Sequence, residues 1–303
     1  MTKIEWCDET INPIIGCSAT PISPACRNCY AARMAYRLGH GGLAPEGPTR
    51  KAYKAVVDPD TRYWNGQTRF VAGTFGGPER RKKPTTYFVG SMADMALSEY
   101  RTLSYISDRL EEMSHHTFLI LTKRPGPWIA LFAALENVWI GASASDQADL
   151  DRVAPDLLRY GGPRTFLSLE PLLGPITLGP DGNFLLEGKG CIRAVIVGGQ
   201  TGPGAAPMHP DWARSLRDDC AKAGVPFFFK QWGEFRPPET PEEWEAFKNG
   251  KGFHGTLVLN GTFEDPHGRA QVRVGKSSAG RLLDGRTHDD LPWPVRNLNR
   301  KDA

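Results

Sequence analysis

The sequence predicts an α/β protein built as a partial (β/α) barrel, with a long insertion in its N-terminal half and a small β-containing appendage at its C-terminal end. Short apolar segments alternate with amphipathic helical segments from about residue 85 to residue 229, which is typical of parallel β/α folds. We find no repeat of fixed period, which argues against a solenoid. A chain of 303 residues that is 40% hydrophobic is long and apolar enough to bury the core of such a barrel.

The first predicted strand covers residues 10–16, and a cysteine-rich loop separates it from a predicted helix over 29–38. Further strands and helices are predicted to alternate along the chain. The predicted strands are 85–90, 117–121, 138–142, 164–169, 192–197 and 225–229, and the predicted helices are 100–114, 127–135, 146–160 and 211–223. Residues 176–189 are rich in Gly and Asp and are expected to form a loop or small hairpin.

Two stretches interrupt this alternation. Residues 39–84 lack a sustained apolar period and contain many Gly, Pro, Lys and Arg residues, so we expect an insertion with little regular structure. Residues 233–245 are rich in Pro and Glu and mark a boundary between a barrel over 1–232 and an appendage over 233–303. Within this appendage, strands at 256–259 and 270–274 with an Asn260-Gly261 turn are typical of a hairpin.

The composition limits the compartment and the partners. Residues 1–24 lack the charged and apolar regions of a signal peptide, and no run of about 18 apolar residues is present, so we expect a soluble cytoplasmic protein with no membrane partner. The net charge of +3 is too small to indicate a polyanionic partner by itself. In a long intracellular chain, the six cysteines indicate metal ligands or buried thiols rather than disulfides.

Three cysteines lie in one short loop, with eight residues between Cys17 and Cys26 and two between Cys26 and Cys29. This pattern predicts a metal site. A [4Fe-4S] cluster on three cysteines leaves one iron free for a small molecule, whereas a structural zinc site needs a fourth protein ligand, which Cys7 or His40 could supply. The cysteines outside the loop, Cys7, Cys191 and Cys220, are expected to be small buried hydrophobic side chains.

Polar residues follow the predicted strands, where the active site of a parallel barrel forms. These residues are Ser91, Asp94, Thr122, Lys123, Arg124, Ser143, Ser145, Glu170, Gln200, Lys230 and Gln231. The competing interpretation is that they cap helices or form ion pairs in the loops, as Ser91, Asp94, Ser145 or Asp146 could do.

The insertion is strongly basic. Residues 39–84 contain nine basic and four acidic residues, a local net charge of +5, and Tyr53, Tyr63, Trp64 and Phe70 lie among them. This mixture is suited to neutralising phosphates and stacking on bases, so it predicts a nucleic-acid surface; a solvated basic loop explains it equally well.

The cysteine loop with Tyr30 directly after the last cysteine resembles the radical S-adenosylmethionine (SAM) superfamily. Motifs over nearly the whole chain resemble a phage and bacterial family of radical-SAM-like proteins. These motifs are I-E-W at 4–6, N-P at 12–13, L-T-K-R-P at 121–125, L-S-L-E-P-L-L-G-P at 167–175, V-G-G-Q-T-G-P-G at 197–204, M-H-P-D-W at 208–212, F-F-K-Q-W-G at 228–233 and G-R-L-L-D-G at 280–285. The chain departs from most members in having eight, not three, residues between the first two cysteines, and it matches the glycine-rich SAM motifs only loosely.

The resemblance implies a partial barrel of the radical SAM type, a [4Fe-4S] cluster on the three cysteines, SAM bound at the free iron, and an external electron donor. It also implies a division of the polar residues between two ligands. The implied SAM-binding residues are Tyr30, Ser91, Asp94, Lys123, Ser143 and Glu170. The implied substrate-binding residues are Arg124, Gln200, Lys230 and Gln231.

The same resemblance implies a substrate. Phage relatives are associated with hypermodified thymine in DNA, where a radical enzyme can act as an isomerase on a glycyl group attached to thymine; a phage-encoded protein would work in the host cytoplasm. Two alternatives stay open, namely a radical SAM enzyme for another nucleotide or a peptide, and a zinc-binding nucleic-acid module without catalysis. The sequence gives no indication of the oligomeric state.

Overall fold

The computed structural model describes residues 4–179, 192–239, 241–248, 257–259 and 270–296. Its centre is a seven-stranded sheet with the strand order β1-β4-β5-β6-β7-β8-β9, in which every neighbouring pair is parallel. The strands are β1 (Glu9–Ile11), β4 (Thr86–Val89), β5 (Thr117–Thr122), β6 (Val138–Ser143), β7 (Thr165–Leu169), β8 (Ile192–Gly198) and β9 (Phe227–Gln231). The sheet curls into a half-barrel with β1 and β9 at its two edges, which confirms the predicted partial (β/α) barrel.

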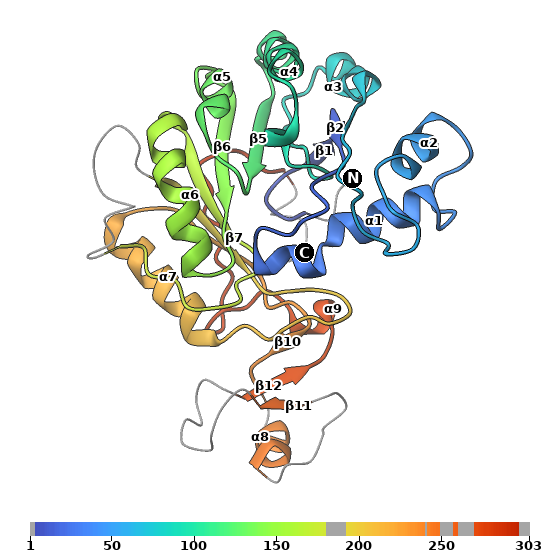
Figure 1. The fold of residues 1–303 in the computed structure, drawn as a ribbon. Helices are drawn as coiled ribbons and strands as arrows, with labels where there is room; N and C mark the ends of the chain where they lie inside the picture. The colour runs from blue at the N-terminus through green and yellow to red at the C-terminus, as the bar shows by residue number, and fades with distance from the viewer. Residues whose placement is uncertain (1–3, 180–191, 240, 249–256, 260–269, 297–303) are drawn as a thin grey trace.

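Helices cover the outer face of this sheet. Figure 1 shows α4 (Tyr100–Glu112), α5 (Ala130–Ala133), α6 (Gln147–Tyr160) and α7 (Pro210–Ala223) in an arc around the strands. Strand residues alternate between the two faces, so Phe118 and Ile120 of β5 pack into the core beneath the helices, whereas Leu119 joins the opposite, inner face. The predicted helices at 100–114, 146–160 and 211–223 are confirmed, and the one at 127–135 begins as a 3-10 turn, η4 (Pro127–Ile129).

The inner face of the half-barrel is apolar over most of its depth. Trp6, Phe88, Phe166, Phe228 and Trp293 are buried together there. The indole nitrogen of Trp293 donates a hydrogen bond to the Trp6 carbonyl oxygen at 3.0 Å, so a residue near the end of the described chain packs against one near its beginning. This apolar layer leaves the carboxyl ends of the strands as the polar part of the interior.

The first predicted strand is divided in two. β1 ends at Ile11, and β2 (Ile14–Ile15) pairs with β3 (Arg69–Phe70) in a separate antiparallel sheet. Pro13 cannot donate a ladder hydrogen bond, and the Asn12 side chain accepts from the Met92 backbone nitrogen at 3.0 Å. The Asn-Pro pair therefore turns the chain out of the barrel just before the cysteine loop.

The insertion is more regular than the sequence predicts. Residues 39–84 contain α2 (Pro48–Lys54), β3, the 3-10 turn η2 (Ala72–Phe75) and α3 (Gly76–Arg80), so the expectation of little regular structure was wrong. Tyr53, Val56 and Trp64 are buried against α1 (Tyr30–Gly39) in a small core of their own. Few apolar residues are enough to order the insertion, because α1 lies directly beside it and supplies a second packing surface.

The C-terminal part forms a small antiparallel sheet, ordered β10 (Phe235–Arg236), β12 (Ala270–Arg273) and β11 (Leu257–Leu259), next to the short helices α8 (Pro241–Lys248) and α9 (Lys276–Ala279). The pairing of β11 with β12 confirms the two predicted hairpin strands. The Asn260-Gly261 turn and most of 176–189 lie outside the described residues. The boundary between a barrel and an appendage at residue 232 stays a prediction. Among the helices that the structure describes, none is long and apolar enough to cross a membrane.

Candidate functional site

The cysteine loop lies at the carboxyl ends of the first two barrel strands. Gly16, just before Cys17, donates from its backbone nitrogen to the Met92 carbonyl oxygen at 3.0 Å, which places the start of the loop beside the residues that follow β4. Cys26 lies in a 3-10 turn, η1 (Pro24–Asn28), and Cys29 directly precedes α1. All three thiols are free and half-buried.

The three cysteines gather around the side chain of Tyr63. Its hydroxyl donates to the Cys26 carbonyl oxygen at 2.9 Å. Burial raises the pKa of Tyr63, and the nearby Cys29, Cys26 and Cys17 thiols raise it further. Burial, together with the neighbouring Asp94, also raises the pKa of Cys17. Both shifts reflect the burial of these side chains, and that of Cys17 also reflects the carboxylate of Asp94.

The other cysteines with described positions lie elsewhere. Cys7 is buried in the apolar inner layer, where burial raises its thiol pKa, and Cys220 is buried beneath α7, so the prediction for these two is confirmed. Cys191 lies outside the described residues. In the part of the chain with described positions, no three His, Cys, Asp or Glu side chains converge closely enough to hold a single metal ion.

Asp94, which follows β4, contacts the predicted polar residues at the end of β5. It caps the 3-10 turn η3 (Met95–Leu97), as the helix-cap interpretation predicts. It also accepts hydrogen bonds from the Thr122 hydroxyl at 2.6 Å and the Lys123 backbone nitrogen at 3.1 Å, and it pairs with the Arg124 guanidinium at 3.2 Å. The Asp94 side chain is only 8% exposed, so Arg124 mainly neutralises a buried carboxylate.

Lys123 has different surroundings. Its side-chain nitrogen donates to the Ser143 hydroxyl, a neutral acceptor, at 2.8 Å. Strand alternation places both residues on the inner face, in line with Leu121 and Gly141, two positions earlier in the paired strands. Lys123 thus brings a positive charge to the interior of the rim.

Glu170 and Lys230 form a second charged group on the inner face. Their side chains pair at 2.9 Å, and Glu170 also accepts from the Trp6 indole nitrogen and the Ser168 hydroxyl, both at 3.2 Å. Burial alone would lower the pKa of Lys230, but Glu170 and Glu5 outweigh it and raise this pKa. A Cβ at Gly198 would lie 2.7 Å from the Glu170 carboxylate, so the glycine makes room for this pair.

Tyr30 is the first residue of α1, directly after the cysteine loop. Its ring is exposed, while its hydroxyl donates to the Ser91 carbonyl oxygen at 2.9 Å. The Ser91 hydroxyl in turn donates to the Asn12 side chain at 3.1 Å. Tyr30 therefore links the end of the cysteine loop to the residues after β4.

Gln200 and Gln231 make bonds within the loop after β8. The Gln200 side chain accepts from the Ala206 backbone nitrogen at 2.8 Å, and that of Gln231 donates to the Gly199 carbonyl oxygen at 2.9 Å. These bonds fix the loop next to β9. A role for either residue in binding a substrate stays a prediction.

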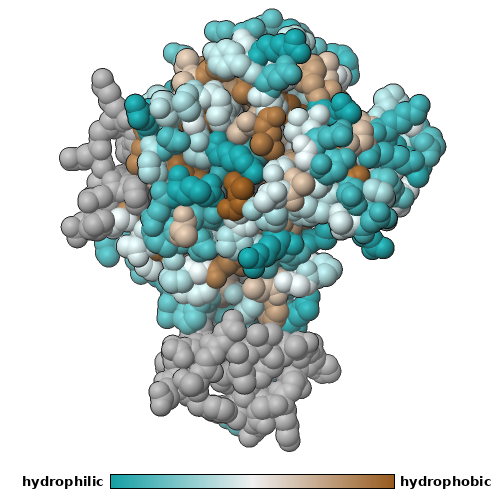
Figure 2. Space-filling view, in the orientation of Figure 1, coloured by the Kyte–Doolittle hydropathy of each residue, from teal (hydrophilic) through white to brown (hydrophobic). Residues whose placement is uncertain are grey.

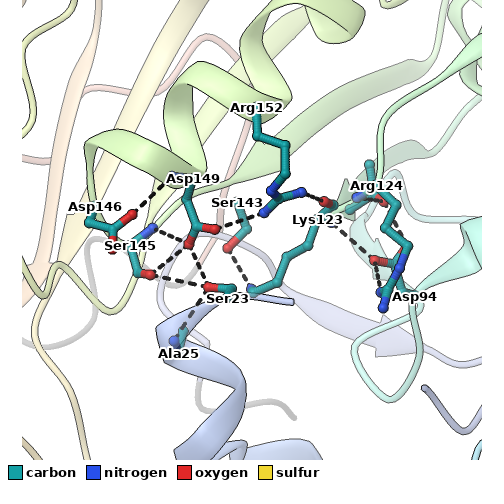
Figure 3. Close-up of polar contacts among 11 residues, drawn as sticks. Ser23, Ala25, Asp94, Lys123, Arg124, Ser143, Ser145, Asp146, Asp149 and Arg152 are labelled. Carbon is teal, nitrogen blue, oxygen red and sulfur yellow. Dashed lines mark hydrogen bonds and ion pairs between the residues drawn. The ribbon is translucent and has the colours of Figure 1, made fainter. Parts of the chain in front are cut away.

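The sequence analysis missed Asp149 and Ser23. Figure 3 shows Asp149, on α6, at the centre of a buried network that includes Ser23 of the cysteine loop and Ser145 after β6. Asp149 accepts from both hydroxyls and from the Ser145 backbone nitrogen, and it pairs with Arg152 at 2.7 Å. Burial alone would raise the pKa of Asp149, but the bonds from Ser23, Ser145 and Arg152 lower it overall. An acid in the first turn of a helix is commonplace in sequences, so no signal distinguished it.

Two groups of exposed lysines and arginines in the insertion lie apart from each other. Lys51 and Lys54 are exposed on α2, which packs against α1 near Gly39, the last residue of that helix. The surface over α1 and α2 is predominantly hydrophilic (Figure 2). Arg80, Lys82 and Lys83 are exposed just before β4, at the amino ends of the strands. Tyr53 and Trp64 are buried, so they are unavailable to stack on bases, whereas Phe70 is exposed.

The fold and the site define a half-barrel protein with a three-cysteine loop and a charged rim at the carboxyl ends of its strands. The chain belongs to the family described as "Protein of unknown function (DUF5131)", whose model matches residues 1–292. No curated protein matches the sequence.

Two of the similar solved structures are of spore photoproduct lyase. One, a cysteine-to-serine mutant, is 11% identical with a TM-score of 0.39, and the match covers 89% of this chain and 69% of that one. The other, complexed with a dinucleoside spore photoproduct, is 10% identical with a TM-score of 0.34, and the match covers 90% of this chain and 92% of that one.

Proposed function

We propose that this protein is a radical SAM enzyme whose cysteines Cys17, Cys26 and Cys29 hold a [4Fe-4S] cluster. The observation that carries the proposal is the loop itself, which brings three free, half-buried thiols to the carboxyl ends of a parallel half-barrel. When bound, the cluster and SAM would supply a 5'-deoxyadenosyl radical. Binding and orientation of the two ligands must come from the residues around the loop.

The donor set suits a cluster better than a single ion. A tetrahedral zinc site needs four protein ligands within about 2.3 Å of one centre. No three candidate ligands in the described ranges converge in this way, and Cys7 lies in the apolar layer. A cluster binds each thiolate at a different iron, which requires only that the thiols surround a common space.

The rim residues have distinct roles in this proposal. Lys123 offers a cation to a carboxylate of SAM, Ser143 and Ser91 offer hydroxyls, and Asp94 keeps the backbone of Lys123 in place. The pair of Glu170 and Lys230 offers an anion and a cation to polar groups deeper in the barrel. Tyr30 offers an exposed ring directly after the cysteine loop.

For the substrate, we propose an amino-acid-modified thymine in phage DNA and an isomerase reaction. Hydrogen is removed from the α-carbon of a glycyl group that is joined to the thymine methyl carbon through nitrogen. The bond from nitrogen to that methyl carbon breaks, a bond from the α-carbon forms, and the hydrogen returns, so that a free amine results without net oxidation.

An external donor supplies the electron, and the host cytoplasm is the expected location. The exposed cations of α2, which packs against the helix that follows the loop, support a nucleic-acid substrate; another nucleotide or a peptide is the alternative.

The cluster assignment is tested by replacing its ligands. We expect Cys26→Ala and Cys29→Ala to lose bound iron and sulfide when purified anaerobically, since two cysteines hold a cluster poorly. Cys220→Ala is the matched control, because Cys220 is buried beneath α7, and it should retain the brown cluster, as should Cys191→Ala. Full iron and sulfide content in either loop variant would disprove the assignment, and a colourless zinc protein would favour a non-catalytic module.

A further inference from the structure

We propose that Asp149 is a positioning residue that anchors the cysteine loop, through Ser23, to the same rim segment that carries Lys123. The inference rests on the proposed function in one respect, namely that the loop holds a cluster. The hydrogen bonds of the anchor do not depend on it. It joins α6, on the outside of the barrel, to the middle of the loop between Cys17 and Cys26.

The loop side of the anchor is a single hydroxyl. Ser23 is 6% exposed, and its hydroxyl donates to Asp149 and lies 3.1 Å from the Ser145 hydroxyl. The same oxygen accepts from the Ala25 backbone nitrogen at 3.3 Å and so caps the turn η1, which carries Cys26. Ser23 therefore fixes the position and the local conformation of the residues next to a proposed ligand.

Capping of α6 does not explain Asp149. That task belongs to Asp146, whose side chain accepts from the Asp149 backbone nitrogen at 2.9 Å. Asp149 is 3% exposed, and a buried carboxylate must be satisfied by donors. Its donors come from three separate parts of the chain, namely the cysteine loop, the segment after β6 and α6 itself.

Arg152 extends the anchor to the rim. One of its guanidinium nitrogens pairs with Asp149, and another donates to the Lys123 carbonyl oxygen at 2.6 Å, as Figure 3 shows. The side chain of Lys123 then reaches Ser143. One carboxylate thus sets the position of the cysteine loop relative to the cation on the inner face.

The first test measures thiol reactivity in the metal-free, full-length protein. Ser23→Ala should raise the rate at which the loop cysteines react with a disulfide reagent about tenfold, because a hydrogen bond to a charged group shifts a local opening equilibrium by that order. Ser18→Ala is the matched control, since that hydroxyl accepts from the Thr20 nitrogen in the exposed part of the same loop. Equal rates in Ser23→Ala and the parent would overturn the anchor.

The second test separates positioning from helix stability. Asp149→Asn and Asp146→Asn both alter the first turn of α6, but only the first should increase thiol reactivity and speed the loss of iron from the loaded protein to a chelator. If both variants lower the melting temperature equally and neither changes the thiols, Asp149 serves α6 alone and the proposal fails. Should Asp149→Asn not fold, Ser23→Ala decides. Because the thiol rates need no cluster, a chain that never binds iron would disprove the proposed function and leave the anchor intact.

Discussion

Two neighbouring cations, Lys123 and Arg124, differ in what their charges face. The sequence predicts that both bind carboxylates at the site. In the structure Arg124 pairs with the buried Asp94, whereas the Lys123 side chain donates to the neutral Ser143 hydroxyl. Arg124 is thus paired with a carboxylate and Lys123 with a neutral hydroxyl, so we propose Lys123 as the cation that meets a ligand.

Lys123→Met should therefore weaken the binding of SAM about tenfold, because a charge-assisted hydrogen bond to a carboxylate is removed. Arg124→Met should leave that affinity nearly unchanged and lower the melting temperature, since Asp94 loses its cation. Calorimetric titration of SAM and thermal unfolding measure the two effects. Equal decreases of affinity in both variants would mean that Arg124 also contacts the ligand.

At this scale the sequence showed which residues follow the strands but not what they touch. Asp94, Lys123 and Glu170 were predicted as site residues because polar residues after parallel strands meet at one rim. Asp149 was not predicted as a site residue because its partner Ser23 is far away in the sequence. Only the structure shows that its carboxylate is buried and accepts a hydrogen bond from Ser23. Gln200 and Gln231 had the same sequence signal as Lys230 and yet bond to backbone in a loop.

Helix α2 is the element that changes the predicted nucleic-acid surface. The sequence treats all of 39–84 as one basic stretch, whereas the structure packs α2 against α1, the helix that follows the cysteine loop, and places residues 80–83 just before β4, at the amino ends of the strands. Under the proposed function, the phosphates next to a bound base would lie on the cysteine-loop side of the barrel. We therefore expect the cations of α2, which packs against α1, to contribute more to DNA binding than residues 80–83.

The double variant Lys51→Glu/Lys54→Glu should weaken binding to a duplex oligonucleotide and reduce its salt dependence. The log–log slope should fall by about 0.9 for each phosphate that the protein no longer neutralises, because fewer counterions are released. Lys82→Glu/Lys83→Glu makes the same change of charge at the far end and should alter both quantities much less. Fluorescence anisotropy at several salt concentrations measures these values. A larger effect from the second pair would place the DNA on the other side of the barrel.

Regular elements were predictable where packing follows a simple period. The helix at 100–114 was found from Leu103, Ile106, Leu110 and Met113, all of which are buried beneath it. α2 was missed because it has one buried side chain, Tyr53, and depends on α1 for the rest of its packing. The break after β1 was missed because the strand pattern continues through Ile14 and Ile15, which belong to another sheet.

At the scale of the whole molecule, the interior of the barrel is completed by the C-terminal segment. Trp293 is 4% exposed and packs against Trp139 and Phe166, with ring centroids 5.0 and 5.1 Å apart. The Arg296 backbone nitrogen donates to Asp8 at 2.8 Å, which also holds the start of β4. Trp293, from the predicted C-terminal appendage, therefore packs in the apolar inner layer of the half-barrel.

Trp293→Ala should lower the free energy of unfolding by about 3–5 kcal/mol, because it leaves a large cavity in the apolar inner layer. Leu282→Ala, in the same segment but 54% exposed, should change it by well under about 1 kcal/mol. Urea unfolding of both variants provides the comparison. A small decrease for Trp293→Ala would mean that the inner layer does not depend on this segment.

The last strand of the half-barrel, β9, would present unpaired backbone groups if nothing lay beside it. The Phe229 backbone nitrogen donates to the His288 carbonyl oxygen at 2.9 Å, and Phe228 forms a β-bridge with Asp289. An uncovered, apolar edge strand such as Phe227–Gln231 is a template for pairing with another chain. The segment around His288 therefore covers this edge. A chain shortened before His288 would expose β9, and we expect it to aggregate.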